Sequence, residues 1–366
     1  MTYKLNRRKL LLAGAGIATT LAAPAIVRAA GSQNFTGKTL NLLTWSDNTG
    51  LAVLDLIAKP FEEMTGAKVI ADRTGSTSEM VAKLRATGSK PVYDVITLAG
   101  VGAITLADDG LLAKPDLNKL PNLLDVDPRF RTGADGHGIG YLLWTGGLIY
   151  NTKTFKSPPK SYAEMWEASH AGRVFLPPST WTDALDTIVA TEKMLGAKIA
   201  DVAHADAAFK KLSDLRPNLL TFGENPTQIS ELFYADALDL GGVYAPAFFA
   251  NELKDPASSN MGATYDLDEG FYADLMYTIM PKVKPGDDEV VHAFLNFTLD
   301  PNVQGQLAEA VLNGPVNTKA VMSEAAKASP FIIKPEQLGQ NAVVEDKNFM
   351  AQVREDWIKN YTRALA

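Results

Sequence analysis

Carboxylates and aromatic side chains recur together along this 366-residue chain, at positions where strands are expected to end. This combination suits an ammonium group, because carboxylates supply charge-assisted hydrogen bonds and aromatic rings supply cation–π attraction. The sequence therefore predicts a binding site for a small amine. The residues predicted to form it are Trp45, Ser46, Asp47, Trp181, Asp183, Tyr244, Tyr272 and Asp274.

Each of these residues also has a purely structural interpretation. A buried aromatic residue is commonly part of the core, and a carboxylate at the start of a helix, such as Asp183, can simply cap that helix. The binding interpretation is favoured here because the aromatic and acidic residues recur at the carboxyl edges of both halves of the chain.

The first half of the chain reads as a doubly wound sheet. Residues 40–44 and 67–71 are expected to be strands, joined by a helix over 51–64, which makes a βαβ unit. A strand over 93–98 and a helix over 99–109 extend this pattern. Open parallel sheets bind ligands outside the carboxyl ends of their strands, so the loop at 45–47 lies where a ligand would be held.

Two later segments are predicted to connect one lobe to another. Residues 141–151 read as an apolar strand pair broken by Gly146 and Gly147, which would act as a hinge because glycine gives the backbone conformational freedom. Residues 274–280 read as the strand that returns.

Between these crossings, we expect Ser161 to cap a helix over 162–168. A strand over 174–176, a helix over 183–195 and a short strand over 264–267 are also expected.

Several kinds of chemistry find no support in the sequence. The chain has no cysteine, which excludes disulfides and thiol catalysis. Its four histidines are scattered, with no spacing typical of metal ligands, and the G-x-S-x-G, Walker-A and H-E-x-x-H motifs are absent. We therefore expect no metal, no cofactor and no enzymatic activity. A secreted α/β hydrolase stays open as the enzyme alternative, which turnover of generic ester substrates would support.

The N-terminus has the features of a signal peptide. Paired arginines, Arg7 and Arg8, precede an apolar run over 10–23, and small side chains near Ala29 favour cleavage after that residue and twin-arginine export to the periplasm. A membrane anchor is less favoured, because the run is short and Pro24 interrupts it.

Charge narrows the choice of partners. Five of the 35 basic residues and none of the 42 acidic residues lie in the predicted signal peptide, so the remaining chain carries a formal charge of −12. This balance disfavours nucleic acid and anionic lipid, and it favours cationic ligands.

Four segments carry a resemblance to a known family. They are FEEMTGAKV (61–69), SYAEMW (161–166), FLNFTLDP (294–301) and NGPVN (313–317). With the Trp-Ser-Asp loop, they resemble the periplasmic solute-binding proteins of ABC importers, in particular the spermidine/putrescine-binding branch. The resemblance implies a type II periplasmic binding protein fold, in which two doubly wound lobes close on a solute, and a monomer that delivers this solute to a membrane permease.

The resemblance also implies roles for individual residues. Asp274 would be the principal ammonium partner, Asp47 and Asp183 supporting acceptors, and Trp45, Tyr244 and Tyr272 walls, with Trp144 and Trp181 as further candidates. The lobes would comprise residues 34–143 plus 275–317 and residues 144–274 plus 318–366.

This chain departs from the branch at Ala99-Gly100-Val101, where the polyamine binders place a serine and a tyrosine. That change favours a shorter amine, such as one whose carboxylate meets Arg73. Thiamine and an aminophosphonate stay open as alternative solutes.

Overall fold

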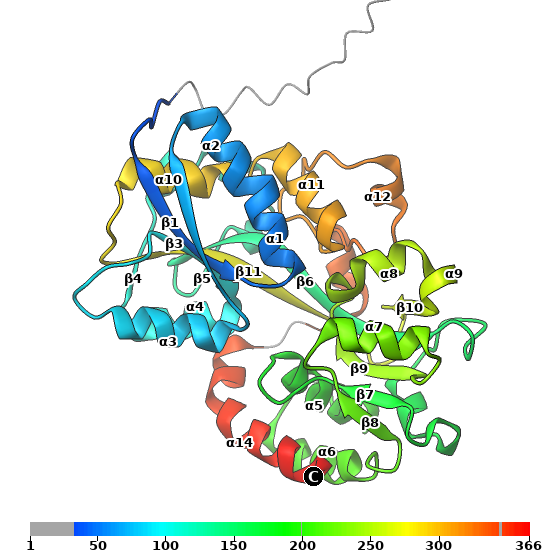
Figure 1. The fold of residues 1–366 in the computed structure, drawn as a ribbon. Helices are drawn as coiled ribbons and strands as arrows, with labels where there is room; N and C mark the ends of the chain where they lie inside the picture. Colours follow the sequence, from blue (N-terminus) through cyan, green and yellow to red (C-terminus); the bar gives the residue numbers. More distant parts are fainter. Residues whose placement is uncertain (1–32, 199, 344–345) are drawn as a thin grey trace, which may run out of the picture.

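Two α/β lobes share one long strand in the computed structural model, which describes residues 33–366 apart from 199 and 344–345 (Figure 1). The predicted signal peptide and its cleavage site after Ala29 lie outside the described residues.

Twelve strands, three of them only two residues long, form the sheet of the described chain. They are β1 (Thr39–Trp45), β2 (Lys68–Thr74), β3 (Val95–Ala99), β4 (Leu112–Ala113), β5 (Thr132–Gly133), β6 (Gly138–Asn151), β7 (Val174–Leu176), β8 (Leu219–Phe222), β9 (Leu240–Tyr244), β10 (Met261–Thr264), β11 (Phe271–Pro281) and β12 (Ala342–Val343). The main strands follow the order β2-β1-β3-β11-β6-β9-β7-β8.

Helices cover both parts of the sheet. The α-helices are α1 (Asn48–Val53), α2 (Lys59–Thr65), α3 (Thr77–Thr87), α4 (Gly100–Asp108), α5 (Asp183–Met194), α6 (Val202–Ser213), α7 (Pro226–Tyr234), α8 (Ala250–Lys254), α9 (Pro256–Ser259), α10 (Asp288–Phe297), α11 (Pro301–Val311), α12 (Glu324–Ala328), α13 (Leu338–Asn341) and α14 (Lys347–Leu365). A π-helical stretch, η1 (Leu54–Ala58), joins α1 to α2. The 3-10 helices are η2 (Leu117–Lys119), η3 (Pro121–Asp125), η4 (Pro128–Phe130), η5 (Tyr162–Trp166), η6 (Ala168–His170), η7 (Pro246–Phe249) and η8 (Pro335–Gln337).

The first lobe is built as its sequence pattern predicts. Strands β1, β2 and β3 are parallel, and the segment from α1 to α2 makes the crossover between β1 and β2. Phe61 of α2 is fully buried and meets the ring of Phe294 from α10 edge-on, with the centroids 5.2 Å apart. Helices α3 and α4 contact β3, so strand ends and helix starts converge at one edge of the sheet.

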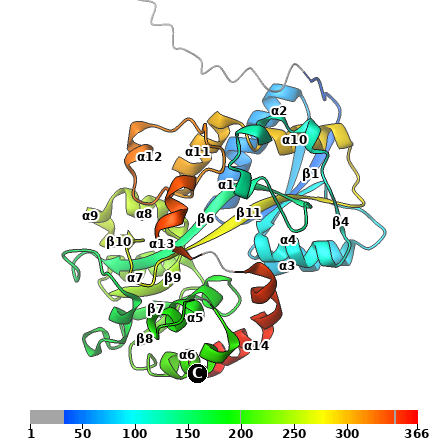
Figure 2. The same cartoon turned by 180° about the vertical axis from the view of Figure 1, so that it is seen from behind.

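The second lobe repeats this design with β9, β7 and β8 in parallel. Phe175 of β7 lies at its aromatic centre, with the ring of Tyr244 at 5.2 Å and that of Phe233 at 6.0 Å between centroids. Helix α5 contacts β9 and α6, and α14 packs along α5 and α6. Figures 1 and 2 both show α14 running down the second lobe, with its first turn next to α4 of the first.

Strand β6 links the lobes without interruption, so the predicted strand pair over 141–151 is a single strand. It pairs with β11 as far as Gly146 and with β9 from Gly147 onwards. A Cβ on Gly146 would lie 2.8 Å from the ring of Trp144, and one on Gly147 would lie 2.5 Å from the carbonyl oxygen of Thr264. Close packing therefore requires both glycines at the point where β6 changes partners. Their role as a hinge and the lobe boundaries stay predictions.

Two local predictions are wrong. The strand expected at 264–267 is β10, which ends at Thr264 because its pairing with β6 covers only 261–264. Ser161 does cap a helix, and its Oγ accepts the N–H of Ala163 at 3.0 Å, but this helix is η5, a 3-10 turn that ends at Trp166.

Candidate functional site

A cavity of about 520 Å³ lies between the two lobes, a volume suited to a small molecule. Strand ends and helix starts of both lobes form its walls, as expected for open α/β sheets. Its lining residues in the first lobe and the crossing strands are Trp45, Ser46, Asp47, Thr49, Gly75, Ser76, Thr77, Ser78, Val81, Arg85, Ala99, Val101, Gly102, Thr105, Trp144, Asp274 and Met276. From the rest of the chain come Thr180, Trp181, Thr182, Asp183, Glu224, Pro226, Ala247, Phe248 and Arg354.

The loop after β1 presents Trp45, Ser46 and Asp47 to this cavity. Asp47 is the N-cap of α1, and its Oδ1 accepts the N–H of Gly50 at 3.0 Å. A Cβ on Gly50 would lie 1.8 Å from the carbonyl oxygen of Trp45, so only glycine lets the helix start this close to the strand. Burial raises the pKa of Asp47, while backbone hydrogen bonds and the charge of Arg73 act in the opposite direction.

Arg73 supports this loop and does not reach the cavity lining defined by the described residues. Its Nε donates to the carbonyl oxygen of Trp45 at 3.2 Å, and its Nη2 donates to that of Ser46. The guanidinium thus already donates hydrogen bonds to backbone carbonyl oxygens, which argues against its predicted contact with a ligand carboxylate.

Asp183 is the most buried carboxylate of the site and belongs to the second lobe. It is 5% exposed and stands at the first position of α5. Its Oδ1 is buried and has no hydrogen-bond partner among the described residues. Burial raises the pKa of Asp183 to about 7, against weaker opposing backbone hydrogen bonds. A carboxylate in this environment gains stability from any cation that enters the cavity.

Asp274 reaches the cavity from β11, where it lies opposite Trp144 of β6. It is 8% exposed, and its Oδ1 accepts the N–H of Leu275 at 2.6 Å. A Cβ on Gly100 would lie 3.1 Å from that same oxygen, so the small residues at the start of α4 leave room for this carboxylate.

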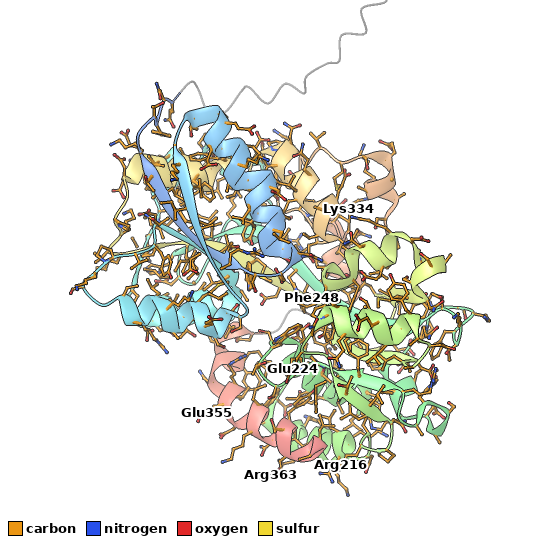
Figure 3. All side chains as sticks on the ribbon, viewed as in Figure 1. Arg216, Glu224, Phe248, Lys334, Glu355 and Arg363 are labelled. Atoms are coloured by element: carbon orange, nitrogen blue, oxygen red, sulfur yellow. The ribbon has the colours of Figure 1, made fainter. Side chains whose placement is uncertain are left out.

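Aromatic rings flank the carboxylates. The rings of Trp181 and Phe248 lie 4.9 Å apart between centroids, with 39° between their planes, and form a wall on the second lobe. Figure 3 shows Phe248 and Glu224 where this lobe faces the first. Trp45 and Trp144 are each 7% exposed and still line the cavity, so Trp144 serves both the core and the site.

Two of the predicted walls, Tyr244 and Tyr272, are absent from the cavity lining in the described part of the chain. Tyr244 is fully buried behind Trp181, at 5.6 Å between ring centroids, and its hydroxyl donates to the carbonyl oxygen of Gly223. Tyr272 is 2% exposed, within the core at the crossing strands. The sequence placed both rings near the correct strand ends, but tertiary packing turns them inward. Tyr244 supports the wall from behind.

The lining residues that were not predicted from the sequence include Glu224, Phe248 and Arg354. Glu224 follows β8, Phe248 lies in η7 and Arg354 lies in α14. Glu224 follows a strand end, the same signal that identified Asp47. Arg354 had no such signal, because it is part of an ordinary amphipathic helix.

The described residues contain no group of His, Cys, Asp or Glu side chains arranged to hold a metal ion. Among the described helices, none combines the length and apolar character needed to cross a bilayer.

Two lobes with a cavity between their strand ends define a two-lobed solute-binding protein. The chain belongs to the family of bacterial extracellular solute-binding proteins, which it matches over residues 57–332.

Curated relatives of the chain include two spermidine/putrescine-binding proteins. The chain is 32% identical over 196 residues to spermidine/putrescine-binding periplasmic protein 1 of Haemophilus influenzae, a match that spans 51% of this chain and only 52% of that protein. It is 25% identical over 284 residues to the spermidine/putrescine-binding periplasmic protein of Escherichia coli, covering 75% of this chain and 76% of the relative.

Solved structures show the same fold. The Atu4243-GABA receptor superposes with a TM-score of 0.73 at 21% identity, covering 90% of this chain and 98% of that one. The spermidine/putrescine substrate-binding protein PotD of Streptococcus pneumoniae gives a TM-score of 0.71 at 19% identity, covering 90% and 100%. The predicted type II periplasmic binding protein fold is confirmed.

Proposed function

We propose that this protein is the periplasmic receptor of an ABC importer and captures a small amine-bearing solute between its lobes. Family membership supports the receptor role, and the polyamine-binding relatives support an amine. The observation that carries the proposal is the buried Asp183 Oδ1, which has no hydrogen-bond partner among the described residues and lies in a cavity that Asp47 and Asp274 also line.

In this proposal, the ammonium group binds between carboxylates contributed by both lobes. Asp274 and Asp183 accept its hydrogen bonds, and Asp47 adds negative charge from the rim. Trp45 and Trp181 provide the flanking rings, which attract a cation through their π faces. No covalent bond is made or broken, so the role is transport and not catalysis.

The lobes close by rotation about the crossing at Gly146 and Gly147, and the closed form is delivered to the membrane permease. The protein works as an exported monomer whose signal peptide is removed after Ala29. Thermal-shift screening of an amine panel against thiamine, an aminophosphonate, sugars and anions tests the alternative solutes.

The test of the site is Asp274→Ala, measured by titration calorimetry against putrescine, spermidine and 4-aminobutyrate. We expect affinity for the bound amine to fall about 100-fold, because a charged hydrogen-bond partner is lost from a buried site. Asp268→Ala is the matched control, since Asp268 is exposed and outside the cavity lining. Unchanged affinity in Asp274→Ala would remove the central assignment.

A further inference from the structure

Arg354 places a cation in the cavity that also presents the carboxylates of Asp183 and Asp274. It lies in the N-terminal half of α14 and contributes to the lining together with Asp183 and Asp274. Its Nη1 is buried and makes no hydrogen bond to any residue that the structure describes. Burial lowers the pKa of Arg354. A buried guanidinium nitrogen without an acceptor is costly, so its retention at a ligand cavity calls for a functional reason.

The helix that carries Arg354 is firmly held by the second lobe. Near its end, Arg216 Nε donates to the carbonyl oxygen of Ala364 at 2.7 Å, and the hydroxyl of Tyr361 donates to that of Pro177 at 2.9 Å. Figure 3 labels Arg216 beside the last turns of α14. The first turns of α14 instead adjoin α4 of the first lobe. The guanidinium is therefore presented between the lobes by a fixed element.

The other arginines around the cavity are already satisfied. Arg85 also lines the cavity, but its Nε forms an ion pair with Asp109 Oδ2 at 2.7 Å. Arg73 donates to the backbone carbonyl oxygen of Trp45. Within the described chain, Arg354 is thus the cavity arginine with a buried guanidinium nitrogen, Nη1, that has no acceptor.

We infer that the solute is an amino carboxylate, whose carboxylate is bound by Arg354 while its ammonium is bound by Asp183 and Asp274. This inference rests on the proposed function and narrows its substrate class. A planar guanidinium presents paired N–H donors that match the two oxygens of a carboxylate. A diamine would bring a second positive charge toward Arg354, so the same residue disfavours polyamines.

Putrescine and 4-aminobutyrate are the matched probes, because both have a four-carbon chain and they differ in one terminal group, an ammonium or a carboxylate. Titration calorimetry on the full mature protein gives both affinities under identical conditions. We expect the wild-type protein to bind 4-aminobutyrate more tightly than putrescine. 2-Aminoethylphosphonate is included as a third probe, and a preference for it over 4-aminobutyrate would overturn the carboxylate assignment.

Arg354→Gln removes the charge and keeps a polar, though shorter, side chain. We expect it to weaken 4-aminobutyrate about 10- to 100-fold, as for the loss of a charged hydrogen-bond partner, and to leave putrescine unchanged or tighter. Arg354→Lys should recover part of the loss. Arg363→Gln is the matched control, an exposed arginine of the same helix that lies outside the cavity lining, and we expect it to change neither affinity by more than about 2-fold.

The possible outcomes distinguish a failure of the proposed amine site from a failure of the carboxylate inference. If putrescine binds and Asp274→Ala weakens it while Arg354→Gln has no effect on 4-aminobutyrate, the amine site stands and the carboxylate inference is overturned. Equal losses of both probes in Arg354→Gln would also overturn it, because they indicate a structural role. If neither probe binds to the wild-type protein, the proposed function fails and the inference fails with it.

Discussion

The two lobes present the same Trp-x-Asp triplet to the cavity, and the two aspartates are used differently. Asp47 stands one residue before α1 begins, where its carboxylate caps the helix through the N–H of Gly50. Asp183 is the first residue of α5, and its Oδ1 is buried and without a partner in the described chain. A shift of one position relative to the helix start separates a carboxylate that stabilises the fold from one that is available to a ligand.

This difference has an energetic consequence. Burial raises the pKa of both aspartates, but Asp47 also contributes a helix cap in the ligand-free protein, whereas the buried Oδ1 of Asp183 has no partner there in the described chain. The Oδ1 of this carboxylate gains a partner only when a cation arrives. The three predictions below test whether the two triplets divide their roles in this way.

The largest expected difference is in ligand affinity. Asp183→Asn should weaken amine binding about 100-fold, because it removes the charged partner of a buried ammonium. Asp47→Asn should weaken amine binding about 10-fold or less, because asparagine still caps α1 and only a supporting negative charge is lost. Titration calorimetry with putrescine and 4-aminobutyrate measures both. Equal losses of affinity in the two variants would show that the two aspartates do not differ in their roles.

A smaller difference is expected in the pH dependence of binding. The pKa of Asp183 in the ligand-free protein is about 7, so below pH 7 an entering ammonium must displace a proton. The amine keeps its own charge throughout this range, and its affinity should therefore fall about 20-fold between pH 7.5 and pH 5.5. Asp183→Asn should flatten this profile, and Asp47→Asn should keep it. A flat profile in the wild-type protein would contradict the assigned pKa.

The smallest difference is in the stability of the ligand-free protein, where the two aspartates should act with opposite signs. The folded-state pKa of Asp183 lies above the ordinary value of an aspartate, 3.8, so the folded state holds more protons and stability falls as pH rises from about 4 to about 7. At pH 8, Asp183→Asn should raise the free energy of unfolding by about 1 kcal/mol, and Asp47→Ala should lower it by about 1 kcal/mol.

Thermal unfolding followed by circular dichroism at pH 8 and pH 4 measures this contrast. The gain in Asp183→Asn should vanish at pH 4, where the wild-type carboxyl group is neutral in the folded state. A loss of stability in Asp183→Asn at pH 8 would show that the ligand-free protein stabilises the ionised Asp183 carboxylate, contrary to this comparison.

Strand-end residues were predictable because the rule behind them is local. A parallel strand followed by a helix places the intervening loop at the carboxyl edge, and Asp47 and Asp183, which were predicted from this rule, both line the cavity. Burial is set by the whole fold, and so Tyr244 and Tyr272 could not be assigned from their strands alone. Both rings point into packed cores that are built from distant segments.

Arg354 illustrates a second limit of prediction from the sequence. It follows Asp183 by 171 positions and reaches the cavity only because α14 lies across α5 and α6 with its first turns against α4. Nothing in its immediate neighbours distinguishes it from the surface arginines of other helices. Its importance comes from the missing acceptor, which is a property of the folded protein.

Strand β6 belongs to both lobes, and this limits how the protein can be divided into fragments or engineered. Cutting the chain between Gly146 and Gly147 would leave each half with an exposed strand end and unpaired backbone groups, a surface prone to aggregation. A biosensor made from this receptor should therefore keep both halves intact and carry its fluorophores on surface loops. The reporter would then respond to the angle between the halves, while the continuous β6 strand preserves the scaffold.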